Sequence, residues 1–128
     1  MNKFSGIITD IHSEGKINSI LIEKCSAKVQ VITLELDGNF KVGDTVKVVF
    51  RASDVALTKL ENDVFSENKI LGNVVSLDSG KLMGRVKIES DIGPISSVIT
   101  TKSISDNNIE VGMQLYATFK ATSVSLVG

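Results

Sequence analysis

The chain has few of the residues on which common enzymatic and extracellular chemistries depend. Of its 128 residues, one is cysteine, one is histidine and none is tryptophan. The single cysteine, Cys25, excludes an internal disulfide framework and favours a reducing cytosol. A Cys–His catalytic pair would have to combine Cys25 with His12, and no carboxylate is placed to orient them. Because no phosphate-binding glycine loop, zinc-ligand spacing or nucleophile elbow is present either, we expect a protein that is not an enzyme.

Neither His12 nor Cys25 is expected to form a reactive site. We expect His12 to be a surface residue in a turn with Ser13, Glu14 and Gly15. Cys25, which follows an apolar run, is expected to be a small packing residue.

The charge and hydrophobicity of the chain exclude further classes of partner. Fourteen Lys and Arg residues oppose fifteen Asp and Glu, so the net charge is −1. This composition lacks the basic surface from which phosphate-backbone binding draws its affinity. Five Phe and one Tyr offer few stacking groups for a nucleic-acid-binding module. No apolar run approaches the roughly 20 residues needed to span a bilayer, and the N-terminus has no signal-peptide pattern. We therefore expect a cytoplasmic protein that binds neither nucleic acid nor membrane.

The most informative feature is an internal repeat. Residues 42–57 align without a gap on residues 111–126, with six of sixteen positions identical. The openings correspond as well, because Asn2–Gly6 matches Asn68–Gly72. The alignment predicts two units, residues 1–60 and 61–128, joined near residues 59–67.

Each unit has the pattern of short strands. Val29, Val31, Leu34 and Leu36 nearly alternate with polar residues, and turn chemistry follows at residues 37–39. A helical turn is predicted only in the second unit, over residues 103–108, with Ser103 or Ser105 as its N-cap. The predicted fold class is all-β, with two small OB-like β-barrel units in tandem. Units of about 60 residues bury little surface alone, so we expect the two to pack together and chains to associate. A self-sufficient monomer is the alternative.

The order and spacing of several motifs resemble the molybdate-binding Mop domains, also called molbindin or TOBE domains. The matching stretches lie at residues 80–89, 99–104 and 116–124, and the duplication resembles the tandem, di-Mop form. The resemblance implies an OB-like barrel per unit and a cytoplasmic storage or homeostasis protein for molybdate, or tungstate. It also implies a homo-oligomer, a trimer in tandem relatives, with the oxyanion bound between subunits. No organic cofactor and no direct side-chain metal ligand are implied.

The resemblance also implies an oxyanion site built from donors, because a tetrahedral dianion carries only acceptor oxygens. The segment that closes each unit supplies a cation, small residues and hydroxyls, and the segment that opens each unit supplies amides and cations. The candidate binding residues are Lys120, Ala121, Thr122, Ser123, Arg51, Ala52, Ser53, Ser66, Asn68, Lys69, Asn2 and Lys3.

The sequence departs from the family pattern at two positions. Glu67 stands where the family has an arginine, and Asp54 stands where a hydroxyl residue is expected. Ser66 is expected to replace a displaced serine, and Lys69 or Lys3 to replace the missing cation. Like charges repel, so both carboxylates disfavour a bound dianion.

Alternatives remain for several of these residues and for the function. Asn2 and Asn68 could instead cap turns through local hydrogen bonds. The glycines at positions 6, 43, 72 and 112 are expected to serve backbone geometry. The alternative function is an oxyanion-sensing or protein-interaction module, related to molybdate-regulator ligand domains, that has lost tight binding.

Overall fold

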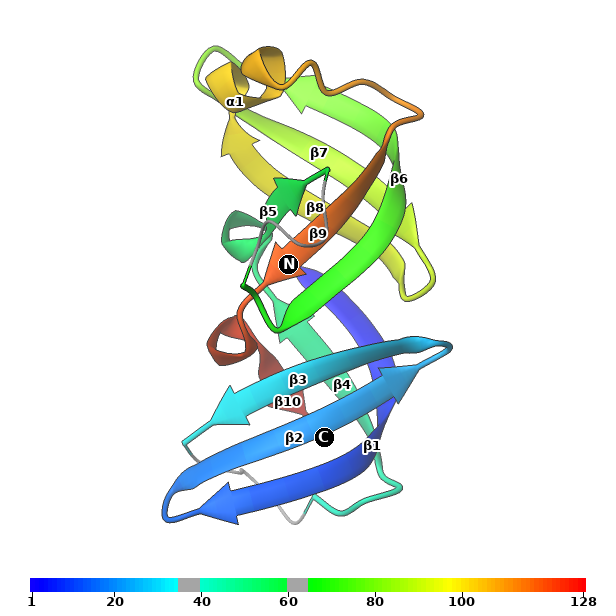
Figure 1. Ribbon diagram of the computed structural model, residues 1–128, viewed down its shortest axis with the longest axis vertical. Coiled ribbons are helices and arrows are strands. Elements are labelled where there is room, and N and C mark those ends of the chain that lie inside the picture. Colours follow the sequence, from blue (N-terminus) through cyan, green and yellow to red (C-terminus); the bar gives the residue numbers. More distant parts are fainter. Residues whose placement is uncertain (35–39, 60–64) are drawn as a thin grey trace.

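In the computed structural model, which describes residues 1–34, 40–59 and 65–128, the chain is nearly all-β, as predicted. The described residues form two five-stranded sheets stacked end to end (Figure 1). The strands are β1 (Asn2–Glu14), β2 (Ile17–Lys24), β3 (Ala27–Thr33), β4 (Thr45–Phe50), β5 (Ala56–Thr58), β6 (Asn68–Ser79), β7 (Met83–Ser90), β8 (Gly93–Thr100), β9 (Gln114–Phe119) and β10 (Ser125–Val127).

The two repeats exchange their last strands. The first sheet has the order β10-β4-β1-β2-β3, and the second has the order β5-β9-β6-β7-β8. Strand β5 belongs to the first repeat but pairs with β9 of the second, and β10 returns to pair with β4 of the first. Figure 1 shows each short strand lying in the opposite half of the molecule. Two OB-like units in tandem were expected, and each sheet has the five strands that were predicted. The boundary at residues 60 and 61 lies outside the described residues and stays a prediction.

One hydrophobic core runs through both units. The inward positions of β1 and β6 alternate with exposed ones, which gives the two-residue period of a half-buried strand. The rings of Phe50 and Phe119 stack at 4.1 Å between centroids and 10° between planes, and Phe4 meets Phe50 edge-on. The expectation that the two units pack together is therefore confirmed.

Backbone geometry explains the glycines that open each repeat. A Cβ atom on Gly72 would lie 2.1 Å from Ile88 Cγ2, and one on Gly6 would lie 2.5 Å from Ile22 Cγ2. No side chain fits where neighbouring strands approach so closely. Gly43 and Gly112 each adopt a φ of 97°, in the region that glycine tolerates best. The predicted backbone role of these glycines is confirmed.

Several local predictions need correction. The helix α1 (Thr101–Asp106) begins two residues early, and its N-cap is Thr100, whose Oγ1 accepts a hydrogen bond from Ser103 N at 3.0 Å. Cys25 is exposed, with a φ of 54° in the turn between β2 and β3, so it is not a packing residue. Strand β3 ends at Thr33, one residue before Leu34.

Two further predictions concern His12 and the turn at residues 37–39. His12 is a surface residue, with 78% of its side chain exposed, as predicted. The predicted turn is wrong at this position, because His12, Ser13 and Glu14 belong to β1 and the turn begins at Gly15. His12 Nε2 lies 2.9 Å from Asp10 Oδ2. Leu36 and the predicted turn at residues 37–39 lie outside the described residues.

Candidate functional site

The closing segments of the two repeats meet between the sheets. After β4, residues Ala52–Asp54 form a single 3₁₀ turn, η1, and after β9, residues Ala121–Ser123 form its counterpart, η3. The turns form because the small Ala52 and Ala121 are buried while their neighbours stay at the surface. Each turn begins at a cation, since Asp54 N donates to Arg51 O and Ser123 N donates to Lys120 O.

The opposite repeat anchors each turn. Turn η1 packs on β8, and η3 packs on β3. The buried hydroxyl of Ser97 in β8 donates to Val55 O at 2.6 Å, just after η1. Thr118 in β9 donates to Ala56 O at 3.1 Å. These contacts hold the link between β4 and β5 against the second sheet, so the exchange of strands also positions the two turns.

A groove of about 710 Å³ lies beside Lys120; we call it the Lys120 groove. It receives residues from both repeats, and four of them are candidate binding residues from the sequence. The groove is lined by Ser53, Asp54, Ala56, Phe65, Ser66, Glu67, Thr118, Phe119, Lys120 and Ser123. Hydroxyls and one ammonium group thus converge on a single surface.

A second groove, of about 410 Å³, lies beside Arg51; we call it the Arg51 groove. Its lining is largely the repeat-related counterpart of the first, and it shares Asp54 and Ser123 with it. The lining residues are Met1, Val49, Phe50, Arg51, Asp54, Thr122, Ser123, Ser125 and Val127. The two grooves therefore flank the stacked Phe50 and Phe119 rings.

The two cations differ in their surroundings. Arg51 Nε lies 2.9 Å from Asp54 Oδ2, and Arg51 Nη2 lies 3.5 Å from Asp54 Oδ1. In the second repeat, Ser123 stands at the position that corresponds to Asp54. Lys120 forms no ion pair with any residue that the structure describes. The Lys120 groove therefore offers an ammonium that pairs with no described carboxylate, while the guanidinium of the Arg51 groove already holds one.

The predicted asparagines lie elsewhere and join the two sheets. Asn68 Nδ2 donates to Gln30 O at 2.9 Å, and Gln30 N donates to Asn68 Oδ1 at 2.8 Å. Asn2 makes the same pair of bonds with Ser96, at 2.9 and 2.8 Å. Both asparagines are buried, and these partners are distant in sequence, so the asparagines do not form the local turn caps considered as an alternative.

Some of the remaining candidates line a groove and the others do not. Ser66 lines the Lys120 groove and donates to Phe119 O at 2.8 Å. Thr122 lines the Arg51 groove, while Ala52 and Ala121 lie buried beneath the turns. The structure does not bring Lys3 or Lys69 into either groove.

Several lining residues were not among the predicted site residues, and the uncharged polar ones among them are Thr118 and Ser125. The internal repeat could have indicated Ser125, because it aligns with Ala56 directly after the two turns.

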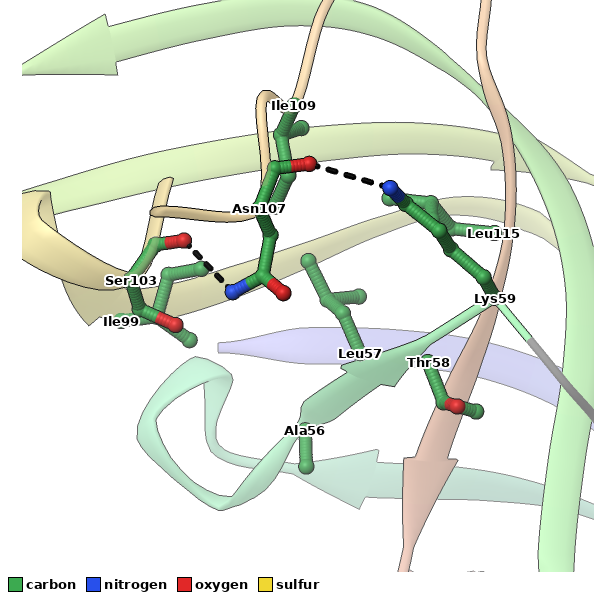
Figure 2. A pocket seen from close by; sticks show the side chains of 9 residues that line it. All are labelled: Ala56, Leu57, Thr58, Lys59, Ile99, Ser103, Asn107, Ile109 and Leu115. Carbon is green, nitrogen blue, oxygen red and sulfur yellow. Dashed lines mark hydrogen bonds between the residues drawn. The ribbon is translucent and has the colours of Figure 1, made fainter. Parts of the chain in front are cut away.

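A separate pocket of about 200 Å³ lies between β5 and α1 and contains none of the predicted site residues (Figure 2). Its walls combine apolar side chains with Thr58, Lys59, Ser103 and Asn107. The Lys59 side chain donates from Nζ to Asn107 O at 3.1 Å. Asn107 Nδ2 donates in turn to Ser103 O at 2.8 Å. Among the described residues, no three His, Cys, Asp or Glu side chains gather as a metal site. The same part of the chain has no helix long and apolar enough to cross a membrane.

Comparison with known proteins decides the family. No family model matches the chain. A curated relative, the probable molybdenum-pterin-binding protein of Haemophilus influenzae, is 36% identical over 62 residues, which span 48% of this chain and 90% of the relative. The chain belongs to the Mop-domain family.

The fold of this Mop-domain protein also matches a solved structure over almost its whole length. A molybdate-bound crystal structure of the cytoplasmic molybdate-binding protein ModG superimposes with a TM-score of 0.88. The match covers 98% of this chain and 94% of that one, at 21% sequence identity. At this identity the likeness establishes the tandem fold, which agrees with the predicted fold class.

Proposed function

We propose that this Mop-domain protein binds molybdate, as a tetrahedral oxyanion, in the grooves between its repeats and serves in cytoplasmic storage and homeostasis. The convergence of Lys120 with hydroxyls from both repeats carries the proposal. The names of the related proteins, a molybdenum-pterin-binding protein and the cytoplasmic molybdate-binding protein ModG, support the choice of ligand and compartment. Tungstate has the same charge and shape, so we propose it as a second ligand. Binding is non-covalent, and no reaction is catalysed.

The chemistry of the Lys120 groove suits such a ligand. Molybdate has four acceptor oxygens and two negative charges, and it needs donors on several sides. Lys120 supplies a charged donor, and Ser53 and Ser123 supply hydroxyls that rotate to meet the ligand. The Ser66 hydroxyl can donate to the ligand only if it gives up its hydrogen bond to Phe119 O. No side chain coordinates molybdenum directly in this arrangement, and no organic cofactor is required.

We also propose that the site is completed between subunits of a homotrimer. The Lys120 groove, at about 710 Å³, is much wider than one tetrahedral ion, so it leaves room for donors from a neighbouring chain. The outer face of β6 presents Leu71 and Val75 at 45% and 46% exposure, two positions that lie on the same side of the strand. Burying these side chains against a second copy would stabilise the assembly.

The alternative, an oxyanion-sensing or interaction module with weak binding, is favoured by one observation. Glu67 and Asp54 line the same groove as Lys120, and their carboxylates oppose a dianion. In that case oxyanion would change the assembly of the protein only at high concentration.

The test is native mass spectrometry of the purified protein titrated with molybdate, tungstate and sulfate. We expect a trimer that takes up molybdate in whole-number steps and does not take up sulfate. Lys120→Gln should abolish this uptake. Lys81→Gln is the matched control, because Lys81 is exposed in the turn between β6 and β7 and lines neither groove.

Two results would contradict the proposal. A wild-type protein that binds no molybdate rules out storage, and unchanged binding by Lys120→Gln rules out the Lys120 groove.

A further inference from the structure

The two repeats differ at one position that faces both grooves. The repeat alignment places Asp54 opposite Ser123, and Arg51 opposite Lys120. In the folded protein Asp54 and Ser123 lie where the Lys120 groove and the Arg51 groove meet, and each lines both. The symmetry of the fold makes the two turns equivalent in backbone, so the difference between their cations comes from these side chains. The grooves also differ where Ser66 and Glu67 line the first and Met1 lines the second.

We propose that Asp54 competes with the oxyanion for Arg51. The Asp54 carboxylate occupies the Arg51 guanidinium and leaves the Lys120 groove as the binding groove. This inference rests on the proposed function and determines which of the two related sites is used. Asp54 is thus a residue that determines specificity between the grooves.

The geometry of the ion pair supports this role. The Asp54 carboxylate reaches two nitrogens of Arg51, at 2.9 Å to Nε and 3.5 Å to Nη2. An oxyanion prefers the same fork of donors, because guanidinium binds carboxylate and tetrahedral anions through paired N–H groups. The Asp54 side chain is 24% exposed and the Arg51 side chain 69%, so the pair lies near the surface and solvent screens part of its attraction. An incoming dianion must therefore displace Asp54 or bind beside its negative charge.

In the opposite turn no carboxylate is bonded to the cation, although Asp54 and Glu67 also line the Lys120 groove. Ser123 is a neutral hydroxyl that can donate to an oxyanion, and its backbone N–H bonds to Lys120 O, within the turn itself. Lys120 is exposed and has no carboxylate partner in the described part of the chain. The ammonium is therefore available to a ligand without first breaking an ion pair.

The experiment changes the charge at position 54 and counts bound oxyanion. Wild type, Asp54→Asn and the double variant Asp54→Asn, Arg51→Met are titrated with molybdate by calorimetry, with sulfate as the control anion. Asparagine keeps the shape of the side chain but removes the charge. We expect Asp54→Asn to bind one more molybdate per chain than wild type. The affinity of this added site should be about tenfold higher than that of the same site in wild type. Arg51→Met in the same background should remove this gain.

The reciprocal variant tests the same idea from the other side. Ser123→Asp places a carboxylate three residues after Lys120, as Asp54 lies after Arg51. We expect it to weaken binding in the Lys120 groove by about tenfold. We expect each variant to fold, because an ion pair this near the surface contributes little to stability. Circular dichroism of each variant checks this.

The outcomes separate the inference from the proposed function. If wild type binds molybdate, Lys120→Gln abolishes the binding and Asp54→Asn leaves it unchanged, the inference alone is overturned. Binding by Asp54→Asn but not by wild type supports competition by Asp54, but it contradicts both the Lys120 groove as the binding groove and storage by the natural chain. If no variant binds molybdate, both are wrong.

Discussion

Replacing Asn68 by alanine should destabilise the protein, because this side chain joins the two sheets. The amide forms two hydrogen bonds with the backbone of Gln30, at 2.9 and 2.8 Å, and Asn68 is 1% exposed. Each bond contributes roughly 0.5–1.5 kcal/mol net, and a polar group left buried without a partner costs roughly 1–3 kcal/mol. Because Gln30 is half-buried, water can reach part of the vacated site. We expect a loss of about 2–4 kcal/mol in the free energy of unfolding.

Urea unfolding followed by far-UV circular dichroism measures this loss, and amide hydrogen exchange locates it. Exchange at the Gln30 amide should accelerate in Asn68→Ala beyond the change that global destabilisation causes. The Ser96 amide, which Asn2 holds in the same way, is the internal reference within the same molecule. Asn73→Ala is the matched variant, since Asn73 is an exposed asparagine of the same strand and should leave stability nearly unchanged.

One pattern of results would refute the reasoning. If Asn68→Ala keeps its stability and its protection at Gln30 but loses molybdate, the side chain serves the ligand rather than the sheets. Loss of stability, with binding retained once the protein is folded, supports the structural role.

Three further changes test the packing and the strand exchange. Gly72→Ala should cost about 1–3 kcal/mol of unfolding free energy, because its Cβ would meet Ile88 Cγ2 at 2.1 Å; unchanged urea midpoints would contradict this contact. Phe119→Ala should cost about 3–5 kcal/mol by the same assay, since the ring is buried and stacks on Phe50. Removing residues 125–128 should expose the edge of β4, so amide exchange should rise in the first repeat; a rise in β9 instead would show that the strands are not exchanged.

The sequence supports accurate prediction wherever structure depends on neighbouring residues. The inward positions of β1 alternate with exposed ones, so a period of two residues is enough to recognise the strand. The glycines at 43 and 112 were assigned to backbone geometry, and both adopt a positive φ. The segments at Arg51 and Lys120 were singled out because they are repeated, and the fold brings them together between the sheets.

Prediction fails where a side chain acts on a partner far along the chain. Asn2 and Ser96 are 94 positions apart, and no local pattern indicates that an amide will pair with that backbone. The helix provides a smaller example, because hydroxyl residues at positions 100, 101, 103 and 105 offer several N-caps, and in the fold Thr100 is the one that caps. The sequence also could not show that Asp54 pairs with Arg51 rather than facing solvent, since that depends on how η1 turns.

The exchange of strands explains why the grooves could not be derived from one repeat. Ala56–Thr58 and Ser125–Val127 are similar three-residue strands, so either would fit either sheet edge by side-chain pattern. The choice depends on the links that precede them, because Ser97 holds Val55 O from the opposite sheet. Crossing over carries η1 and η3 to the junction of the two units, where Ser53 of one repeat comes to line a groove with Lys120 of the other. The grooves therefore exist only in the folded tandem, and the duplication supplies both of their walls.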